Sequence, residues 1–204
     1  MYGHFHKAPL RVRFFGAIWR YKWASLCFLA SAYLFASSGY IHAKAILAQY
    51  LIADAWQESV QTGEKITPWA WADTWPVAKL TIADETLYVL AGATGRVMAF
   101  GPGHLSSTPF PGESGNAVIT GHRDTHFSLL QEIKIGEVIT TETASQITQY
   151  KVQEVRIAHQ NQINLTESGI DDELTLITCY PFNSAAPNPE LRYVVRALKV
   201  AVTS

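Results

Sequence analysis

Residues 175–182 read TLITCYPF, an apolar and β-branched run that ends on a cysteine and meets a proline two positions later. β-branched and apolar side chains favour strands, and proline cannot donate a hydrogen bond to a sheet. The run therefore predicts a strand that ends near Cys179. A strand that finishes on a thiol at its exposed end directs attention to the chemistry of that thiol.

Other segments of strand-like composition surround this one, separated by turn residues, and they predict an all-β domain. Several short strands with turn signals between them argue for a sandwich or a closed barrel. A single helical stretch is expected at HFSLLQEI, residues 126–133. The predicted strands are VAKLTI (77–82), ETLYVLAG (85–92), NAVITGH (116–122), EVITTET (137–143), ITQYKVQEVRIAH (147–159), DELTLITC (172–179) and RYVVRALKV (192–200).

The N-terminal quarter of the chain has a different character. Residues 1–53 hold six of the 16 Lys and Arg residues and no acidic residue, and residues 23–43 carry no charge. As a helix, this uncharged stretch would be about 31 Å long, enough to cross a bilayer core of roughly 30 Å. Because basic residues precede it, we expect the N-terminus in the cytoplasm and residues 54–204 outside, in the periplasm or at the cell surface.

These features suggest four segments. We predict a cytoplasmic basic segment at 1–22, a single-pass transmembrane anchor at 23–43, a stalk at 44–74 and a β domain at 75–204. The stalk begins with helical spacing of apolar residues and ends in a connector rich in Trp and Pro. Two alternatives to the anchor are a signal peptide cleaved near residue 45 and a buried helix of a soluble domain.

The chain has two cysteines, and they fall in different environments. Cys27 lies inside the apolar stretch, so the predicted membrane separates it from Cys179. An exported domain then carries one free thiol into a compartment that oxidises thiols, which suggests reactivity. An inert buried cysteine is the alternative.

A reactive thiol needs a base nearby, because only a few per cent of a thiol with a pKa near 8.5 is ionised at neutral pH. His122 follows the predicted strand 116–122, and His126 competes with it four residues later. We expect the other two histidines of the β domain to be solvated loop side chains; they are His104 and His159.

A cation beside the thiol would stabilise an oxyanion. If the last two predicted strands form an antiparallel hairpin, Arg192 at the start of one lies beside Cys179 at the end of the other. Arg196 on the same face is about 13 Å further along and is expected to be structural. Arg123, next to His122, is the second candidate.

Three motifs together resemble the sortases, in particular the class D and class E-like forms that include the single sortases of Gram-negative bacteria. The motifs are TLITC followed by YPF, TGHRDTHF preceded by Gly-Asn, and LRYVVRA, in that order over residues 115–198. The resemblance covers the chain from about residue 75 onward. It implies a closed eight-stranded β-barrel and a cysteine transpeptidase that cleaves an LPXTG-like C-terminal sorting motif between Thr and Gly. Such an enzyme forms a thioacyl intermediate and transfers the protein to an amine acceptor.

By motif position, the resemblance assigns a nucleophile, an acid/base and a substrate-orienting cation, followed by three substrate-binding residues. These are Cys179, His122 and Arg192, and then Asn116, His126 and Thr178. A cysteine hydrolase and a non-catalytic binding barrel remain alternatives. An L,D-transpeptidase fits less well, because its motif sets His and Cys close together whereas 57 positions separate them here.

We expect no cofactor and no metal. His122 and His126 have the i, i+4 spacing of a zinc helix but lack an intervening Glu and an evident third ligand. The acidic residues 171–173 are predicted to form a solvated turn. The expected partners are a secreted protein with a sorting signal, an unidentified amine and the lipid bilayer, with no nucleic acid.

Overall fold

A computed structural model of the chain describes residues 20–161, 172–184 and 189–200. The chain divides into two compact units, residues 1–47 and 48–204. Helix α2 (Lys22–Thr62) begins in the first unit and ends in the second. Among the described residues, it is the one helix with the length and composition needed to cross a membrane. The predicted span and the helical part of the stalk are therefore continuous.

In the second unit, the end of α2 and the connector that follows pack on the β domain. Ile52 is buried with Leu90 and Val97 in a small apolar cluster, to which Trp69 also packs. The ring of Trp69 meets that of Phe100 edge to face, with centroids 5.1 Å apart. Part of the Trp-rich connector thus covers the domain, as aromatic rings that bury large apolar areas do.

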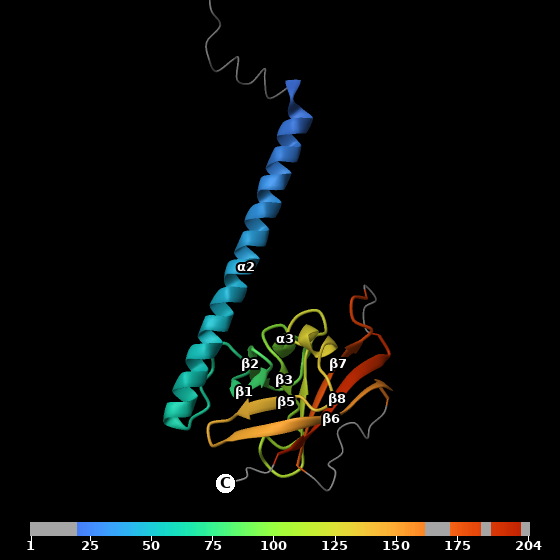
Figure 1. Cartoon of the computed structure of the whole chain (residues 1–204). Coiled ribbons are helices and arrows are strands. Elements are labelled where there is room, and N and C mark those ends of the chain that lie inside the picture. Colours follow the sequence, from blue (N-terminus) through green and yellow to red (C-terminus); the bar gives the residue numbers. More distant parts are fainter. Residues whose placement is uncertain (1–19, 162–171, 185–188, 201–204) are drawn as a thin grey trace, which may run out of the picture. The chain divides into compact units, whose positions relative to one another are not determined.

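Eight strands form a closed barrel in the order β1-β2-β3-β4-β7-β8-β6-β5 (Figure 1). Strands β2 and β3 are parallel, as are β4 and β7, and the other neighbouring pairs are antiparallel. A short helix α3 (Gly95–Met98) and a 3₁₀ turn η1 (Ser128–Gln131) lie in the connections. The strands are β1 (Pro76–Ile82), β2 (Glu85–Ala91), β3 (Gly103–His104), β4 (Asn116–Thr120), β5 (Val138–Glu142), β6 (Ile147–His159), β7 (Glu173–Tyr180) and β8 (Leu191–Lys199).

The sequence-based strands are confirmed, and β3 is the one that the pattern missed. It has two residues, too few for a period-2 signal. The expectation that His104 is a solvated loop residue was wrong: it lies in β3 and is 2% exposed. Its Nε2 is 2.8 Å from the carbonyl oxygen of Pro109, and its ring stacks on Phe110 at 4.8 Å. The helical stretch at 126–133 is only the short η1 turn.

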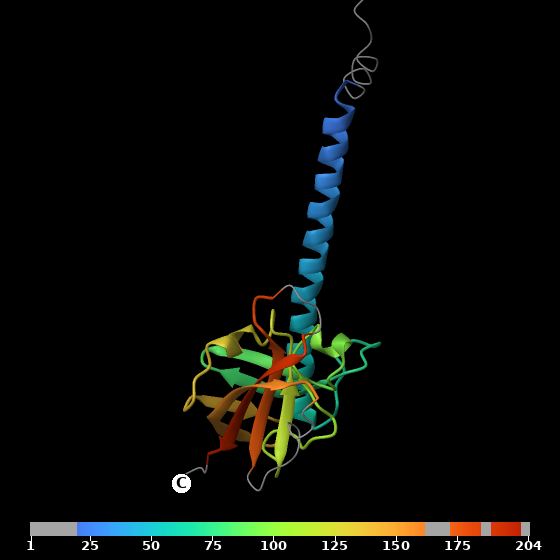
Figure 2. The same cartoon turned by 90° about the vertical axis from the view of Figure 1, so that its right-hand side faces the viewer.

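The alternation of side chains across each strand divides the barrel into an inner and an outer face. On β1, Ala78, Leu80 and Ile82 point into the main core. On the three adjacent strands β4, β7 and β8, which Figure 2 shows side by side, the inner residues are Ala117, Ile119, Leu174, Leu176, Val195 and Ala197. The residues between them in sequence form the outer face, which carries the candidate site.

Candidate active site

The registers of β4, β7 and β8 define cross-strand rows on the outer face. One row joins Thr120 to Ile177, and Ile177 in turn to Val194. Two residues further along β7, Cys179 pairs with Arg192 of β8, so the predicted hairpin register is confirmed. The β4–β7 register ends at Thr120 and Ile177, two residues before His122 and Cys179 respectively. The three predicted residues thus lie at the same end of three neighbouring strands.

Contacts one residue earlier hold the His122 column against β7. The amide of Gly121 donates to the Ile177 carbonyl at 3.1 Å, and the Thr178 hydroxyl donates to the Gly121 carbonyl at 2.7 Å. Gly121 is required here because a Cβ would lie 2.8 Å from ring carbons of the buried Phe127. His122 therefore leaves the sheet from a tightly fixed backbone position.

A compact turn follows His122. The amide of Phe127 donates to the His122 carbonyl at 3.0 Å, and the Phe127 ring is fully buried in the core. The His122 side chain is exposed, whereas His126 is half-buried. Burial lowers the pKa of His126, and the charge of nearby His122 lowers it further. His126 thus belongs to the surroundings of His122 as a largely neutral imidazole.

The guanidinium of Arg192 does not contact Cys179, although the two residues are paired in the sheet. Its Nη1 donates to the Pro189 carbonyl at 2.5 Å and its Nη2 to Gln160 Oε1 at 3.0 Å. Nη1 also donates to the Leu191 carbonyl at 3.0 Å, and all three acceptors are neutral. Within the described part of the chain, no carboxylate forms an ion pair with Arg192.

Two of the predicted substrate-binding residues have internal partners. Thr178 is 2% exposed, faces inward and uses its hydroxyl on Gly121. Asn116 begins β4, about 20 Å from His122 at 3.3 Å per residue. It is buried, and its Oδ1 accepts a hydrogen bond from the Thr175 hydroxyl at 2.8 Å. The structure places Thr178 behind the site and does not bring Asn116 to it.

The described acidic residues at the start of β7, Asp172 and Glu173, are not a solvated turn, contrary to expectation. Glu173 is 4% exposed and accepts hydrogen bonds from Arg196. Asp172 accepts from the Ser114 hydroxyl, the Gly115 amide and Lys199, and these bonds hold its pKa below the usual value. Asp171 lies outside the described residues. The acids serve as local anchors because cations and amide groups of other strands reach them.

The sequence analysis missed an aromatic cluster beside Cys179. The ring centroids of Phe182 and Tyr193 are 5.1 Å apart, and the Tyr180 and Tyr193 rings stack at 6.3 Å. Burial raises the pKa of Tyr193, and Tyr180 adds to the effect. Two of these rings belong to the CYPF motif, which was the available signal. Phe182 and Tyr193 pack against the main core, so the cluster closes the core at the end of the barrel where Cys179 lies.

The described residues contain no group of three or more His, Cys, Asp or Glu side chains placed to hold a metal ion. The thiol itself is free: both cysteines are unpaired, and Cys179 is partly buried. The chemistry available at this end of the barrel is therefore that of a thiol, two imidazoles and a guanidinium.

Comparisons with known proteins match the part of the chain that carries these residues. A family model described as a sortase domain matches residues 80–200. Sortase D of Bacillus subtilis (strain 168) is 28% identical over 115 residues, which cover 56% of this chain and 58% of that protein. This chain thus spans less than two thirds of the length of that relative.

Solved structures agree with the fold. A sortase A from Corynebacterium diphtheriae superposes with a TM-score of 0.58 at 27% identity, covering 65% of this chain and 64% of that one. A Clostridium perfringens protein described as a Sortase D5 transpeptidase has a TM-score of 0.62 and 20% identity, covering 76% and 99%, and this likeness concerns the fold. Since the sortase family model covers more than half of the sequence, the chain belongs to the sortase family.

Proposed function

We propose that the protein is a membrane-anchored cysteine transpeptidase that cleaves a C-terminal sorting motif of the LPXTG type between Thr and Gly and transfers the protein to an amine. The observation that carries the proposal is the row in which Cys179 pairs with Arg192 while the β4 column leads to His122 on its other side. Membership of the sortase family supports the reaction class.

In the first half of the reaction, the Cys179 thiolate attacks the Thr carbonyl of the sorting motif. A C–S bond forms, and the tetrahedral oxyanion accepts a hydrogen bond from Arg192. The bonds of Arg192 to neutral oxygens can be exchanged for this anion because the attraction of opposite charges adds to the hydrogen bond. His122 protonates the Gly amine as the C–N bond breaks, which leaves a thioester.

In the second half, an incoming amine loses a proton to His122 and attacks the thioester. A new amide bond forms as the C–S bond breaks, and the Cys179 thiolate is released while His122 keeps the proton for the next cycle. Water competes with the amine, so the outcome depends on how well the site excludes it. The cluster of Tyr180, Phe182 and Tyr193 keeps water out of the barrel interior at this end, behind the site.

The apolar part of α2 supports a location at the cytoplasmic membrane. We propose that this helix is a retained single-pass anchor with its basic N-terminal side in the cytoplasm, so that the barrel acts outside the membrane. Protease protection of inverted and right-side-out vesicles distinguishes this orientation from the opposite one. Mass spectrometry of the membrane-bound protein shows whether its N-terminus is retained.

The full chain in detergent, given a quenched LPXTG peptide, tests the reaction. We expect cleavage by wild type and none by Cys179→Ala or His122→Ala, with folding retained. His159→Ala is the matched control for the histidine, since that side chain pairs with Glu190 at the edge of β6. A Cys179→Ala protein that cleaves at the wild-type rate would remove the assignment.

A cysteine hydrolase would use the same thiol and imidazole, and only the acceptor separates the two functions. Triglycine added to the assay should convert the hydrolysed product into a peptide extended by three glycines. Mass spectrometry of the products measures the ratio. Hydrolysis alone, unchanged by any amine tested, favours the hydrolase.

A further inference from the structure

Arg123, the residue after His122, has a buried guanidinium that donates to two backbone carbonyls within the described residues. Its side chain is 7% exposed, Nη1 donates to the Pro181 carbonyl at 2.9 Å, and Nη2 donates to the Ser184 carbonyl at 2.6 Å. Its Nε lies 3.4 Å from Asp124 Oδ1. The side chain is directed into the protein's own backbone, so it does not fit the role of oxyanion donor for which it was the second candidate.

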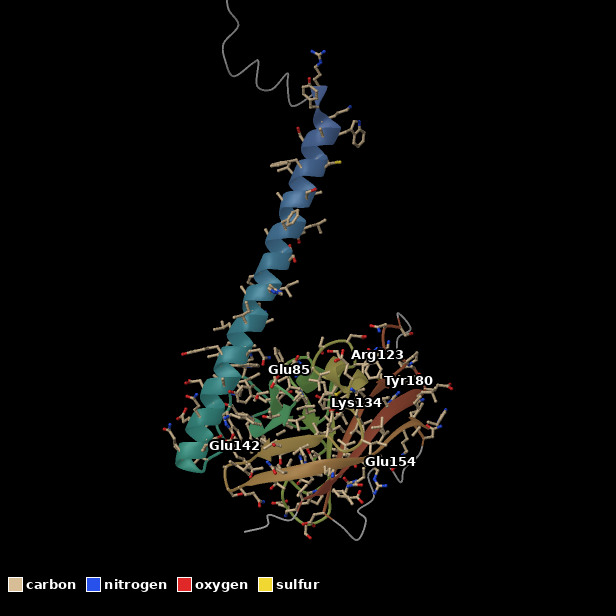
Figure 3. All side chains as sticks on the ribbon, in the orientation of Figure 1. Glu85, Arg123, Lys134, Glu142, Glu154 and Tyr180 are labelled. Carbon is tan, nitrogen blue, oxygen red and sulfur yellow. The ribbon has the colours of Figure 1, made fainter. Side chains whose placement is uncertain are left out.

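The two acceptors lie just beyond the thiol. Pro181 follows Cys179 by two residues, and Ser184 follows it by five. Arg123 thus joins the segment that leaves β4 to the segment that leaves β7, at the end of the barrel where Figure 3 labels Arg123 and Tyr180.

A second contact joins the same two segments on the inner side. The Thr178 hydroxyl holds the Gly121 carbonyl one residue before His122 and Cys179. Arg123 holds the Pro181 carbonyl after them. Hydrogen bonds between the two segments therefore lie both before and after His122 and Cys179.

The chemistry of the guanidinium suits this task. A planar fork donates to two carbonyls at once, and bonds from a charged donor contribute about 1.5–3 kcal/mol each. A lysine ammonium is a point charge on a flexible stem and does not reproduce that fork. Burial of this cation costs hydration, and two of its donor groups are used on backbone carbonyls of another segment, which favours a positional role.

We propose that Arg123 is a positioning residue of the thiol site. It clamps the segment after Cys179 against the turn after His122, which keeps sulfur and imidazole within reach of each other and shapes the aromatic cluster at Phe182. The inference rests on the proposed function for its consequence in turnover, but the clamp itself is testable without turnover.

The variants are Arg123→Gln, which keeps a polar side chain without the charge, and Arg123→Lys, which keeps the charge without the fork. Arg96→Gln is the matched control, because that arginine is 79% exposed and pairs only with Asp73 among the described residues. All are made in the full chain with Cys27→Ser, so that a thiol reagent reports Cys179 alone.

Three measurements are made on each variant in detergent. Hydrogen exchange of residues 180–184 and the pH profile of Cys179 alkylation by iodoacetamide report the clamp. Steady-state cleavage of the quenched peptide reports its effect on turnover. Thermal unfolding confirms that each variant is folded at the assay temperature.

For Arg123→Gln we expect at least tenfold faster exchange at residues 180–184, a displaced alkylation profile, and a 10- to 100-fold fall in kcat with KM changed less than threefold. Arg123→Lys should recover part of the loss, and Arg96→Gln should match wild type.

Unchanged exchange and an unchanged alkylation profile in Arg123→Gln overturn the clamp. If Arg123→Gln does not fold, Arg123→Lys decides by the same criteria. A wild-type protein that neither cleaves nor transfers overturns the proposed function, while exchange and alkylation still decide the clamp.

Discussion

The two ends of the β7–β8 pair carry the same residue type in opposite electrostatic settings. At one end Arg196 pairs across from Thr175, and its guanidinium binds the carboxylates of Glu173 and Glu154. At the other end Arg192 pairs across from Cys179, and its guanidinium binds neutral oxygens of Pro189 and Gln160. Both arginines project from the outer face of the same strand, four residues apart.

The two arginines differ in how far nearby carboxylates compensate their positive charge. Hydrogen bonding to Glu173 is the main reason why the pKa of Arg196 is raised, and two carboxylates compensate its cation. That end of the pair is a structural anchor. At the thiol end the cation keeps its net charge, and a developing oxyanion would find it available. The comparison predicts that equal substitutions at the two ends have unequal consequences.

The largest effect is expected for Arg192→Ala. Loss of an oxyanion donor costs about 10²–10³ in rate, so kcat/KM for the sorting peptide should fall by that factor. The melting temperature should change little because the bonds lost are to partly exposed neutral groups. Peptide cleavage and thermal unfolding of the same preparation measure the two effects. Wild-type turnover in a folded Arg192→Ala protein would reassign this arginine to structure.

The reverse pattern is expected for Arg196→Ala. Glu173 is 5% exposed at its side chain and would be left without its cation, which costs about 3 kcal/mol when a buried pair is broken. Urea unfolding of the full chain, followed by tryptophan fluorescence, measures the free energy. kcat/KM at a temperature where the variant is folded should stay within a few-fold of wild type. A turnover defect as large as that of Arg192→Ala contradicts the division between the ends.

Valine substitutions of two threonines on β7 should have smaller effects, which differ between the two ends of the strand. Thr178→Val removes the bond to the Gly121 carbonyl beside the site, and Thr175→Val removes the bond to Asn116 at the far end. Each should lower the free energy of unfolding by about 1 kcal/mol. Only Thr178→Val should also lower kcat, and Thr178→Ser should restore it. Equal kcat values for the two valine variants would disprove the role of the Gly121 contact.

The smallest effect is expected for the pH dependence of stability at the end of the β7–β8 pair near Asp172 and Arg196. Hydrogen bonds from Ser114, Gly115 and Lys199 lower the pKa of Asp172, so the carboxylate stabilises the fold above its ordinary pKa of 3.8. This stabilisation is lost as the pH falls through the lower folded-state pKa, because the unfolded chain then binds the proton more readily. Urea midpoints of wild type and Asp172→Asn should differ at pH 7 and converge toward pH 3. Asp84→Asn, in the exposed β1–β2 turn, is the control and should show no such convergence.

Local patterns predicted most of the barrel. The strand that carries Cys179 and the long β6 were readable because apolar and β-branched residues recur within each segment. β3 could not be predicted from the local pattern, because its two residues form a strand only by pairing with β2 and β4. For the same reason His104 looked like a loop residue: its burial depends on Pro109 and Phe110, which the barrel brings over it.

The candidate site divides in the same way. The pairing of Cys179 with Arg192 followed from the hairpin register of two neighbouring strands. The hydrogen-bond partner of a polar side chain could not be predicted in this way, because it lies on a segment that is distant in sequence. Asn116 was expected in the groove and instead binds Thr175, and Arg123 was expected as a spare cation and instead holds Pro181.

By itself, the sequence determined the alternating faces of the strands, the uncharged helix near the N-terminus and the residue types at the ends of β4, β7 and β8. These depend on short-range periodicity and composition, which each segment carries on its own. Only the tertiary structure decided which arginine is neutralised, which carbonyl the Thr178 hydroxyl binds and which backbone carbonyls Arg123 binds. Closure of the barrel sets those contacts, since it alone brings charges and polar groups from remote segments within hydrogen-bonding distance.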